Sequence, residues 1–180
     1  GTPIPPSLTL PAMRPPATLL TVLLLPFAVA CSSDDDGPTA TPPERWTATL
    51  AGANEVPPVT TTANGSATFE AVGDTAISYT VTASITGVTM AHIHTGAAGV
   101  NGGVLVWLAP PNGSAPQAAS GAVNGQLATG RFTAAWIRGV GGQPAISLDS
   151  LKRLMRTGNA YVNVHTSAFG GGEIRGQIRN

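Results

Sequence analysis

The sequence predicts an all-β fold, an antiparallel Greek-key β-sandwich or barrel with one short helix. Ala, Thr, Val and Gly dominate the middle of the chain, and its 180 residues include 22 Gly and 16 Pro, so β-branched residues and turn formers prevail. Short runs of alternating apolar and polar residues recur, separated by Gly- or Pro-containing segments. One stretch near residue 150 has helical spacing instead. The length is that of about one ordinary domain.

Most of the expected strands alternate between apolar and polar residues, which places one side chain inward and the next outward. They lie at residues 46–50, 65–72, 76–83, 90–96, 104–108, 121–125, 131–137, 161–165 and 173–179. Two prolines make 52–58 a loop. The run 104–108 is apolar throughout, which favours a central strand. Trp46, Trp107 and Trp136 fall in these strands and are expected in the core.

The helix is predicted at about residues 147–157. Ser147 fits the N-cap, and Asp149 lies in the first turn, where the helix dipole favours an anion. Gly158 can terminate the helix. Its apolar stripe consists of Leu148, Leu151, Leu154 and Met155.

Residues 1–30 are expected to form a signal region for export. The apolar run 19–30 is too short to span a bilayer as a helix, which needs roughly 20 residues. A basic residue, Arg14, precedes the run, and small residues end it, as in a secretory signal. Met13 fits the start of such a signal better than Gly1, so we expect translation to begin at Met13.

The end of this region, residues 28–31 (Ala-Val-Ala-Cys), resembles the lipobox of bacterial lipoproteins. The resemblance implies cleavage before Cys31 and lipid attachment to Cys31, which is the only cysteine of the chain. An ordinary secretory signal followed by an incidental cysteine is the alternative. Residues 31–44 are acidic and have no apolar periodicity, so we expect a solvated tether, with the folded domain at 45–180.

These features predict an extracytoplasmic protein of the cell envelope, held to the membrane by the lipid on Cys31. Ser32 follows that cysteine. By resemblance to Gram-negative sorting, the lack of Asp at this position favours the outer membrane in such a cell. Acidic and basic residues balance at nine each, so no strong field would attract nucleic acid, and we expect no nucleic-acid partner.

Two of the predicted strands contain all three histidines of the chain. His92 and His94 alternate along one strand and therefore share a face. His165 ends another strand, where it shares a face with Tyr161 and Asn163. Whether the two faces are the same face decides what the histidines can do together.

Four motifs resemble the CHRD domain, which is named from chordin and also occurs in bacterial secreted proteins. They are residues 54–58 (Asn-Glu-Val-Pro-Pro), 91–96 (Ala-His-Ile-His-Thr-Gly) with Asn-Gly at 101–102, 158–166 (Gly-Asn-Ala-Tyr-Val-Asn-Val-His-Thr) and 172–177 (Gly-Glu-Ile-Arg-Gly-Gln). The resemblance extends from about Arg45 to Asn180. It implies an extracytoplasmic β-sandwich-like domain, and it does not imply an enzyme activity.

The pair His92 and His94 is also similar to the copper-ligand pattern of Cu/Zn superoxide dismutase. Two imidazoles on one face, with His165 as a third ligand, suit copper or zinc. Asn163 or Glu173 could add an oxygen ligand or orient a ring. With three histidines and one cysteine, the chain lacks a bridged two-metal site and a disulfide, so superoxide dismutation is not expected.

The alternative is a hydrogen-bonded polar patch without metal. The three histidines would then pair with Tyr161, Asn163 and Glu173, and Arg175 would supply the opposite charge. The leading function is accordingly a non-catalytic binding or interaction module for an unknown protein or carbohydrate. The second is a copper- or zinc-binding protein or metalloenzyme that uses His92, His94 and His165.

Overall fold

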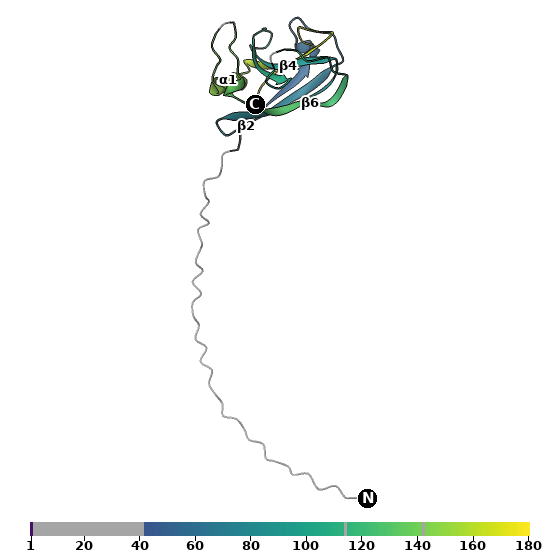
Figure 1. The fold of residues 1–180 in the computed structure, drawn as a ribbon, viewed down its shortest axis with the longest axis vertical. Helices are drawn as coiled ribbons and strands as arrows, with labels where there is room; N and C mark the ends of the chain where they lie inside the picture. The colour runs from purple at the N-terminus through teal and green to yellow at the C-terminus, as the bar shows by residue number, and fades with distance from the viewer. Residues whose placement is uncertain (2–41, 114, 142) are drawn as a thin grey trace. The chain divides into compact units, whose positions relative to one another are not determined.

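The computed structural model describes residues 1, 42–113, 115–141 and 143–180, and within them one antiparallel sheet and one α-helix form a β-rich domain (Figure 1). The predicted all-β class with a short helix is confirmed. Residues 1–30, Cys31 and the tether as far as residue 41 lie outside the described part, apart from Gly1. The elements are β1 (Arg45–Ala51), η1 (Gly52–Asn54), β2 (Asn64–Val72), β3 (Ala76–Thr86), β4 (Val88–Thr95), β5 (Val104–Ala109), β6 (Ala122–Thr133), η2 (Ala134–Trp136), α1 (Leu148–Arg156), β7 (Ala160–Thr166) and β8 (Ile174–Gln177).

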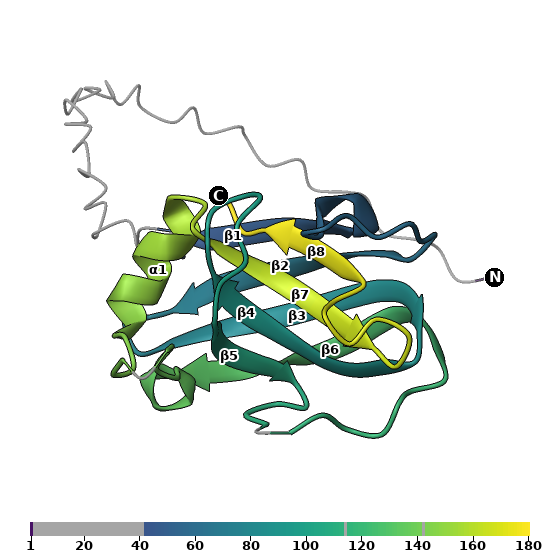
Figure 2. The same cartoon turned by 90° about the horizontal axis from the view of Figure 1, so that it is seen from above.

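The eight strands form a rolled sheet in the order β5-β4-β7-β8-β1-β2-β3-β6. Figure 2 shows β4, β5 and β7 in front of β2, β3 and β6, as two layers of this sheet. The far edge of β5 is engaged as well, because the backbone N–H of Arg138, after η2, donates to the Leu105 carbonyl at 2.8 Å. The Tyr79 hydroxyl of β3 donates to the Leu108 carbonyl at 2.9 Å. The sheet is therefore nearly closed into a barrel.

The prediction that 104–108 is a central strand is wrong, because β5 lies at one end of the strand order. Residues 104–108 are apolar on both faces because both faces are covered. Leu105, Val106 and Leu108 belong to the core, whereas Trp107 packs against the ring of His92 on the outer face. An apolar run can thus mark an edge strand that a side chain or loop covers on its outer face.

The core fills the space between the two layers. Its largest fully buried apolar side chains are Trp46, Phe132, Leu50, Ile77, Ile93, Leu108, Leu151, Met155, Ile174 and Ile178. Each contributes about 1.5–3 kcal/mol by leaving water, before the entropy of ordering is subtracted. The prediction that Trp46 is in the core is therefore confirmed.

The predicted strands at 121–125 and 131–137 are not separate elements, because β6 runs without a break from Ala122 to Thr133. A β-bulge explains this continuity. Val81 and Thr82 of β3 pair with Ala128 and Gln126, which leaves Leu127 as the extra residue. Trp136 lies in the short helix η2 and is only partly buried, so its predicted strand position is wrong.

The helix α1 begins and ends within a residue of the prediction. The Ser147 hydroxyl accepts a hydrogen bond from the Ser150 N–H, as an N-cap does. At the other end, Gly158 has φ of 66°, and Gly158 and Asn159 donate to the carbonyls of Met155 and Leu154, as in a Schellman motif. This turn leads directly into β7. No helix among the described residues is long and apolar enough to cross a membrane.

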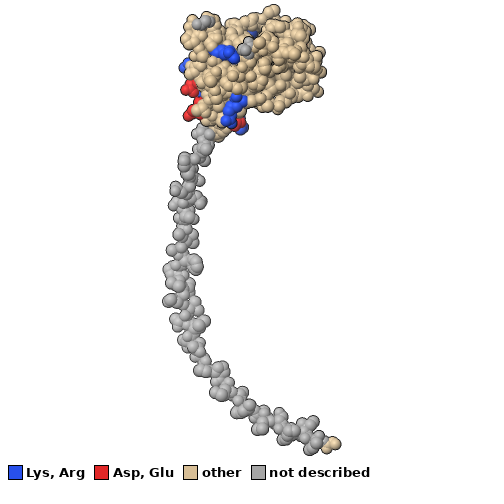
Figure 3. Space-filling view, viewed as in Figure 1, with Lys and Arg blue, Asp and Glu red and all other residues tan. Residues whose placement is uncertain are grey.

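The surface of the domain has few charged side chains, and Figure 3 shows them on one side of the visible face. Among the described residues, the ion pairs are Arg45 with Glu70 and Arg156 with Glu44. Both pairs are exposed and therefore contribute little to stability.

Candidate metal centre

The three histidines lie on the same face of the sheet. Strands β4 and β7 are antiparallel neighbours, and His92 pairs with Asn163 while His94 pairs with Tyr161. Residues directly opposite each other in an antiparallel pair share a face. His165 shares that face with Asn163 and Tyr161, and it lies diagonally across from His92. The two histidine faces predicted from the sequence are therefore one face.

This face is the outer face of the sheet, yet its side chains are buried. The residues that alternate with the histidines, Ala91, Ile93 and Val164, belong to the core on the inner face. The exposed fractions of His92, His94 and His165 are only 2%, 8% and 6%. The turns after β4 and β7 contact the rings, because carbonyls in both turns hydrogen-bond to imidazoles. The cluster is thus enclosed between the sheet and two turns.

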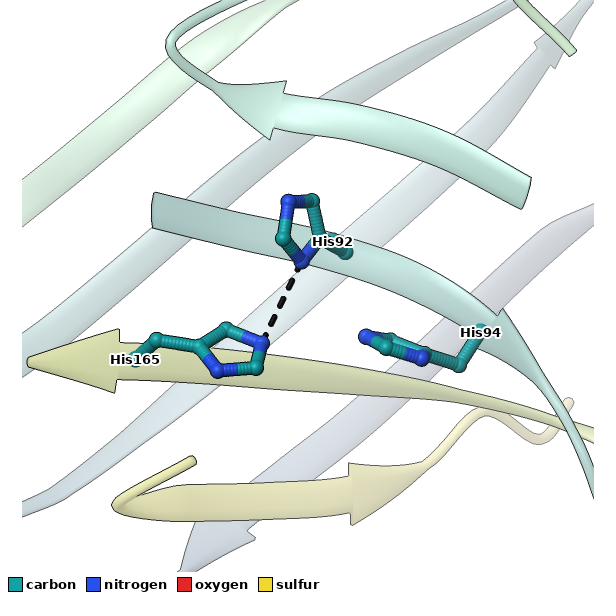
Figure 4. Close-up of side chains that lie close together, drawn as sticks. All are labelled: His92, His94 and His165. Carbon is teal, nitrogen blue, oxygen red and sulfur yellow. Dashed lines mark hydrogen bonds between the residues drawn. The ribbon is translucent and has the colours of Figure 1, made fainter. Parts of the chain in front are cut away.

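The three rings converge on one small space. One ring nitrogen of each histidine lies within 4.8 Å of the corresponding nitrogens of the other two. The closest pair is His92 Nδ1 and His165 Nε2, at 3.2 Å. Figure 4 shows these two rings meeting at the dashed line, with the edge of the His94 ring turned toward them. Nitrogens that share a tetrahedral zinc ion lie about 3.4 Å apart, so small side-chain rotations would bring all three within range of one ion.

Two backbone carbonyls orient the rings. His94 Nδ1 donates to the Gly102 carbonyl and His165 Nδ1 donates to the Gly170 carbonyl, each at 3.0 Å. Because a carbonyl only accepts, each Nδ1 carries the proton and each Nε2 keeps its lone pair. His92 Nδ1 then donates to His165 Nε2, which leaves His92 Nε2 unprotonated. His92 Nε2 and His94 Nε2 are buried and have no hydrogen-bond partner among the described residues.

The environment keeps the imidazoles uncharged. Burial, together with the neighbouring His165 and His94, lowers the pKa of His92 to about 3. Burial lowers the pKa of His94 to about 4, with His165 and Arg175 adding to the shift and the Gly102 carbonyl opposing it. Burial also lowers the pKa of His165, against the Gly170 carbonyl. Three neutral imidazoles with available lone pairs are good ligands for copper or zinc.

Aromatic and cationic groups enclose the cluster. The Trp107 ring meets the His92 ring edge to face, with centroids 4.2 Å apart. Tyr161 stacks on His94, with centroids 4.9 Å apart and an interplanar angle of 11°. The Arg175 guanidinium lies over the Tyr161 ring, 3.4 Å from its centroid. His94, Tyr161 and Arg175 therefore stack in that order, outward from the cluster.

The remaining predicted polar residues divide into two sets. Tyr161 and Asn163 lie beside the histidines on β7, and Arg175 reaches the cluster through Tyr161. Glu173 is buried, and its carboxylate accepts hydrogen bonds from the Thr61 and Thr166 hydroxyls, both at 2.7 Å. Among the described residues, the hydrogen bonds that orient the rings come from backbone carbonyls and not from Glu173.

Sequence reasoning did not identify Glu55, Trp107, Gly102 or Gly170 as neighbours of this face. Glu55 follows η1, and its exposed fraction is 5%. Its Oε1 and the Oδ1 of Asn163 are buried without a partner among the described residues, and both lie close to Gly172. The only sequence signal for Glu55 is its place in the first of the four motifs.

Fold and site together define an all-β domain with a polar cluster enclosed by loops on the outside of its sheet. The family model of the CHRD domain matches residues 46–178, so the chain belongs to the CHRD-domain family. Membership indicates a binding or interaction module. No curated protein and no solved structure gives a significant match to the chain.

Proposed function

We propose that this chain is a binding module of the cell envelope whose ligand is a copper or zinc ion held by His92, His94 and His165. The observation that carries the proposal is the convergence of one nitrogen from each imidazole within 4.8 Å. The family match supports a binding role but names no ligand. The export signal and lipobox resemblance of the first 31 residues support the location.

A metal ion accounts for this geometry better than a hydrogen-bonded patch does. A patch would pair its buried polar atoms, because an unpartnered buried acceptor costs about 1–3 kcal/mol. His94 Nε2 is left without a partner instead. An ion between the rings would take the lone pairs of His94 and His165, and His92 could ligate through Nδ1 by adopting its other neutral tautomer.

We propose a binding role for this ion and not superoxide dismutation. All three histidines of the chain are used by a single site, so no fourth histidine is present for an imidazolate bridge to a second metal. The three-histidine set resembles the ligands of some catalytic zinc sites, in which a fourth position is open to water. Enclosure by Trp107 and the two turns favours storage or transfer of the ion over turnover of a substrate.

A second candidate function is recognition of a protein or carbohydrate. The observation in its favour is family membership, since the CHRD domain indicates an interaction module. This function and metal binding are compatible, because the histidine cluster covers only one part of the outer face.

Isothermal titration of the purified full chain with Zn²⁺ and with Cu²⁺ tests the metal proposal. We expect one equivalent to bind and His94→Ala to weaken binding at least 100-fold, since two imidazoles then remain. Gln126→Ala, an exposed change on β6, serves as the matched control and should bind like the wild type. Absence of stoichiometric binding, or equal binding by His94→Ala, would contradict the proposal.

A further inference from the structure

A second polar site lies at one end of β8, and none of the three histidines lines it. It is an open cavity of about 530 Å³, a volume typical of sites for small molecules. Three segments far apart in the sequence meet around it, at residues 53–58, 98–99 and 175–179. The polar and charged residues of its wall are Asn54, Glu55, Arg175, Gln177 and Arg179. We call this cavity the Glu55 cleft.

The amide donors of the cleft are already occupied. Asn54 Nδ2 donates to the carbonyls of Thr49 and Arg175, at 3.5 and 3.0 Å. Gln177 Nε2 donates to the carbonyls of Gly96 and Gly158, at 2.7 and 2.6 Å. Because carbonyls only accept, the orientation of both amides is fixed, and Asn54 Oδ1 and Gln177 Oε1 remain as acceptors. Neither oxygen has a hydrogen-bond partner among the described residues.

Glu55 adds the strongest acceptor. The residue is 5% exposed. Its Oε1 is buried beside Asn163 and Gly172 with no partner among the described residues, which leaves Oε2 as the oxygen that can face the cleft. A buried carboxyl group without a donor is costly, and burial raises the pKa of Glu55 to about 7 while Arg175 opposes the shift. The cleft therefore combines a carboxyl group with two amide oxygens, and none of the three accepts a hydrogen bond from a described residue.

Two arginines also line the cleft, and the charge of Arg175 acts on Glu55. The Arg175 guanidinium is engaged with Tyr161, with Asn101 Oδ1 at 2.9 Å and with the Val100 carbonyl at 2.6 Å. Arg179 is exposed and lies beside Gly158. Its guanidinium carbon is 3.6 Å from the point that a Cβ atom would occupy if another residue replaced this glycine. Two arginines beside one carboxyl group make the lining unfavourable for a ligand that is only cationic. They favour a ligand that also carries a negative charge.

We propose that the Glu55 cleft binds a small zwitterion with a primary ammonium and a carboxylate, the class that includes amino acids and short peptides. The ammonium donates to Glu55 and to the amide oxygens of Asn54 and Gln177, and the carboxylate pairs with Arg179. Three N–H donors of an ammonium match three acceptors. The proposal goes beyond the metal site and does not depend on it.

Calorimetric titration of the full chain with four probes tests this assignment. The probes are alanylalanine as the zwitterion, ethylamine for the ammonium alone, propionate for the carboxylate alone and glucose as a neutral donor of hydrogen bonds. We expect alanylalanine to bind with a Kd of about 1 mM or tighter and the other three at least tenfold more weakly. Glu55→Gln should weaken alanylalanine binding at least tenfold, whereas the matched control Glu70→Gln on β2 should not change it.

Arg179→Gln keeps the test decisive if Glu55→Gln fails to fold, because Arg179 is exposed. It should weaken alanylalanine binding without affecting any residual binding of ethylamine. Binding of glucose as tight as that of alanylalanine, or no alanylalanine binding by the wild type, would overturn the proposal. So would unchanged affinity in Arg179→Gln. His94→Ala should bind alanylalanine like the wild type, so failure of the metal site and failure of this site give different results.

Discussion

His92 and His94 are uncharged in the folded protein because burial removes the water that would stabilise an imidazolium. The pKa of His92 is lowered to about 3 and that of His94 to about 4, from an ordinary value of 6.5. Glu55 shows the opposite effect on an acid, since burial raises its pKa to about 7. Burial therefore makes the histidines and Glu55 contribute with opposite signs to the pH dependence of folding.

The histidines should make the metal-free chain less stable as the pH falls. Above pH 6.5 they are neutral in both the folded and the unfolded states. Between pH 6.5 and about 4, the unfolded chain gains protons that the folded chain excludes, so the free energy of unfolding falls. The loss at pH 5 is roughly 2 kcal/mol for each of His92 and His94. Urea unfolding of the metal-free full chain at pH 7.5, 6 and 5 measures it.

Glu55 should offset part of this loss. Between pH 4.5 and about 7, the folded chain keeps a proton on Glu55 that the unfolded chain releases. The burial of Glu55 destabilises the fold at pH 7.5, and this destabilisation shrinks by roughly 2 kcal/mol when the pH falls to 5. The wild type should therefore lose at least about 2 kcal/mol between pH 7.5 and 5, and Glu55→Gln at least about 4 kcal/mol, because the lowered pKa of His165 adds to both losses. Equal losses in the two proteins would show that the folded state does not perturb Glu55.

The sequence was informative about the histidines because strand alternation is a local property. The spacing of His92 and His94 places them on one face in any strand, and the residues around His165 follow the same rule. The register of β4 against β7, which makes the two faces one, depends on pairing between residues about 70 positions apart. The carbonyls of Gly102 and Gly170 could not be predicted, since every residue has a carbonyl and only the turn decides where it points.

At the scale of elements, β8 and the turn after β4 are held together by one side chain. Arg175 of β8 donates through Nη1 to Asn101 Oδ1 and through Nη2 to the Val100 carbonyl, while its plane covers Tyr161. The same turn supplies the Gly102 carbonyl that orients His94. Arg175 thus connects the stability of the turn with the geometry of the candidate metal centre.

Replacing Arg175 by lysine should loosen this turn, although the charge is kept. Lysine has no planar fork for Asn101 and Val100 and does not stack on Tyr161 in the same way. We expect a loss of about 2–3 kcal/mol in unfolding free energy and faster amide exchange at residues 97–102. Hydrogen exchange and urea unfolding measure the two effects. Arg131→Lys, an exposed change on β6, should alter neither, and a comparable effect there would refute the role given to Arg175.

Some helices and strands could be predicted from their own residues, and others could not. The helix α1 was predictable because its cap, stripe and terminating glycine are all within twelve residues. The single strand β6 was not, because Gly125 and Gly130 suggest turns and the bulge at Leu127 exists only through pairing with β3. The edge position of β5 likewise depends on the order of the whole sheet.

At the scale of the whole molecule, the domain is described by the structure, whereas residues 2–41 are known from their sequence alone. The domain matches its family over residues 46–178 and contains both proposed sites. The proposal of a lipid anchor rests on the sequence of residues 13–31 alone. If it holds, both sites face the compartment outside the cytoplasmic membrane, where metal ions and small nutrients arrive from the environment.

Expression of the full chain in a bacterial host, followed by detergent phase partitioning, tests the anchor. A lipid chain stabilises membrane attachment by about 0.8 kcal/mol for each buried CH₂ group, so the wild type should enter the detergent phase. Mass spectrometry should find the N-terminal peptide beginning at a lipid-modified Cys31. Cys31→Ser should move the protein to the aqueous phase, whereas Ser32→Ala should leave it in the detergent phase. A wild type that stays in the aqueous phase would refute the lipid anchor.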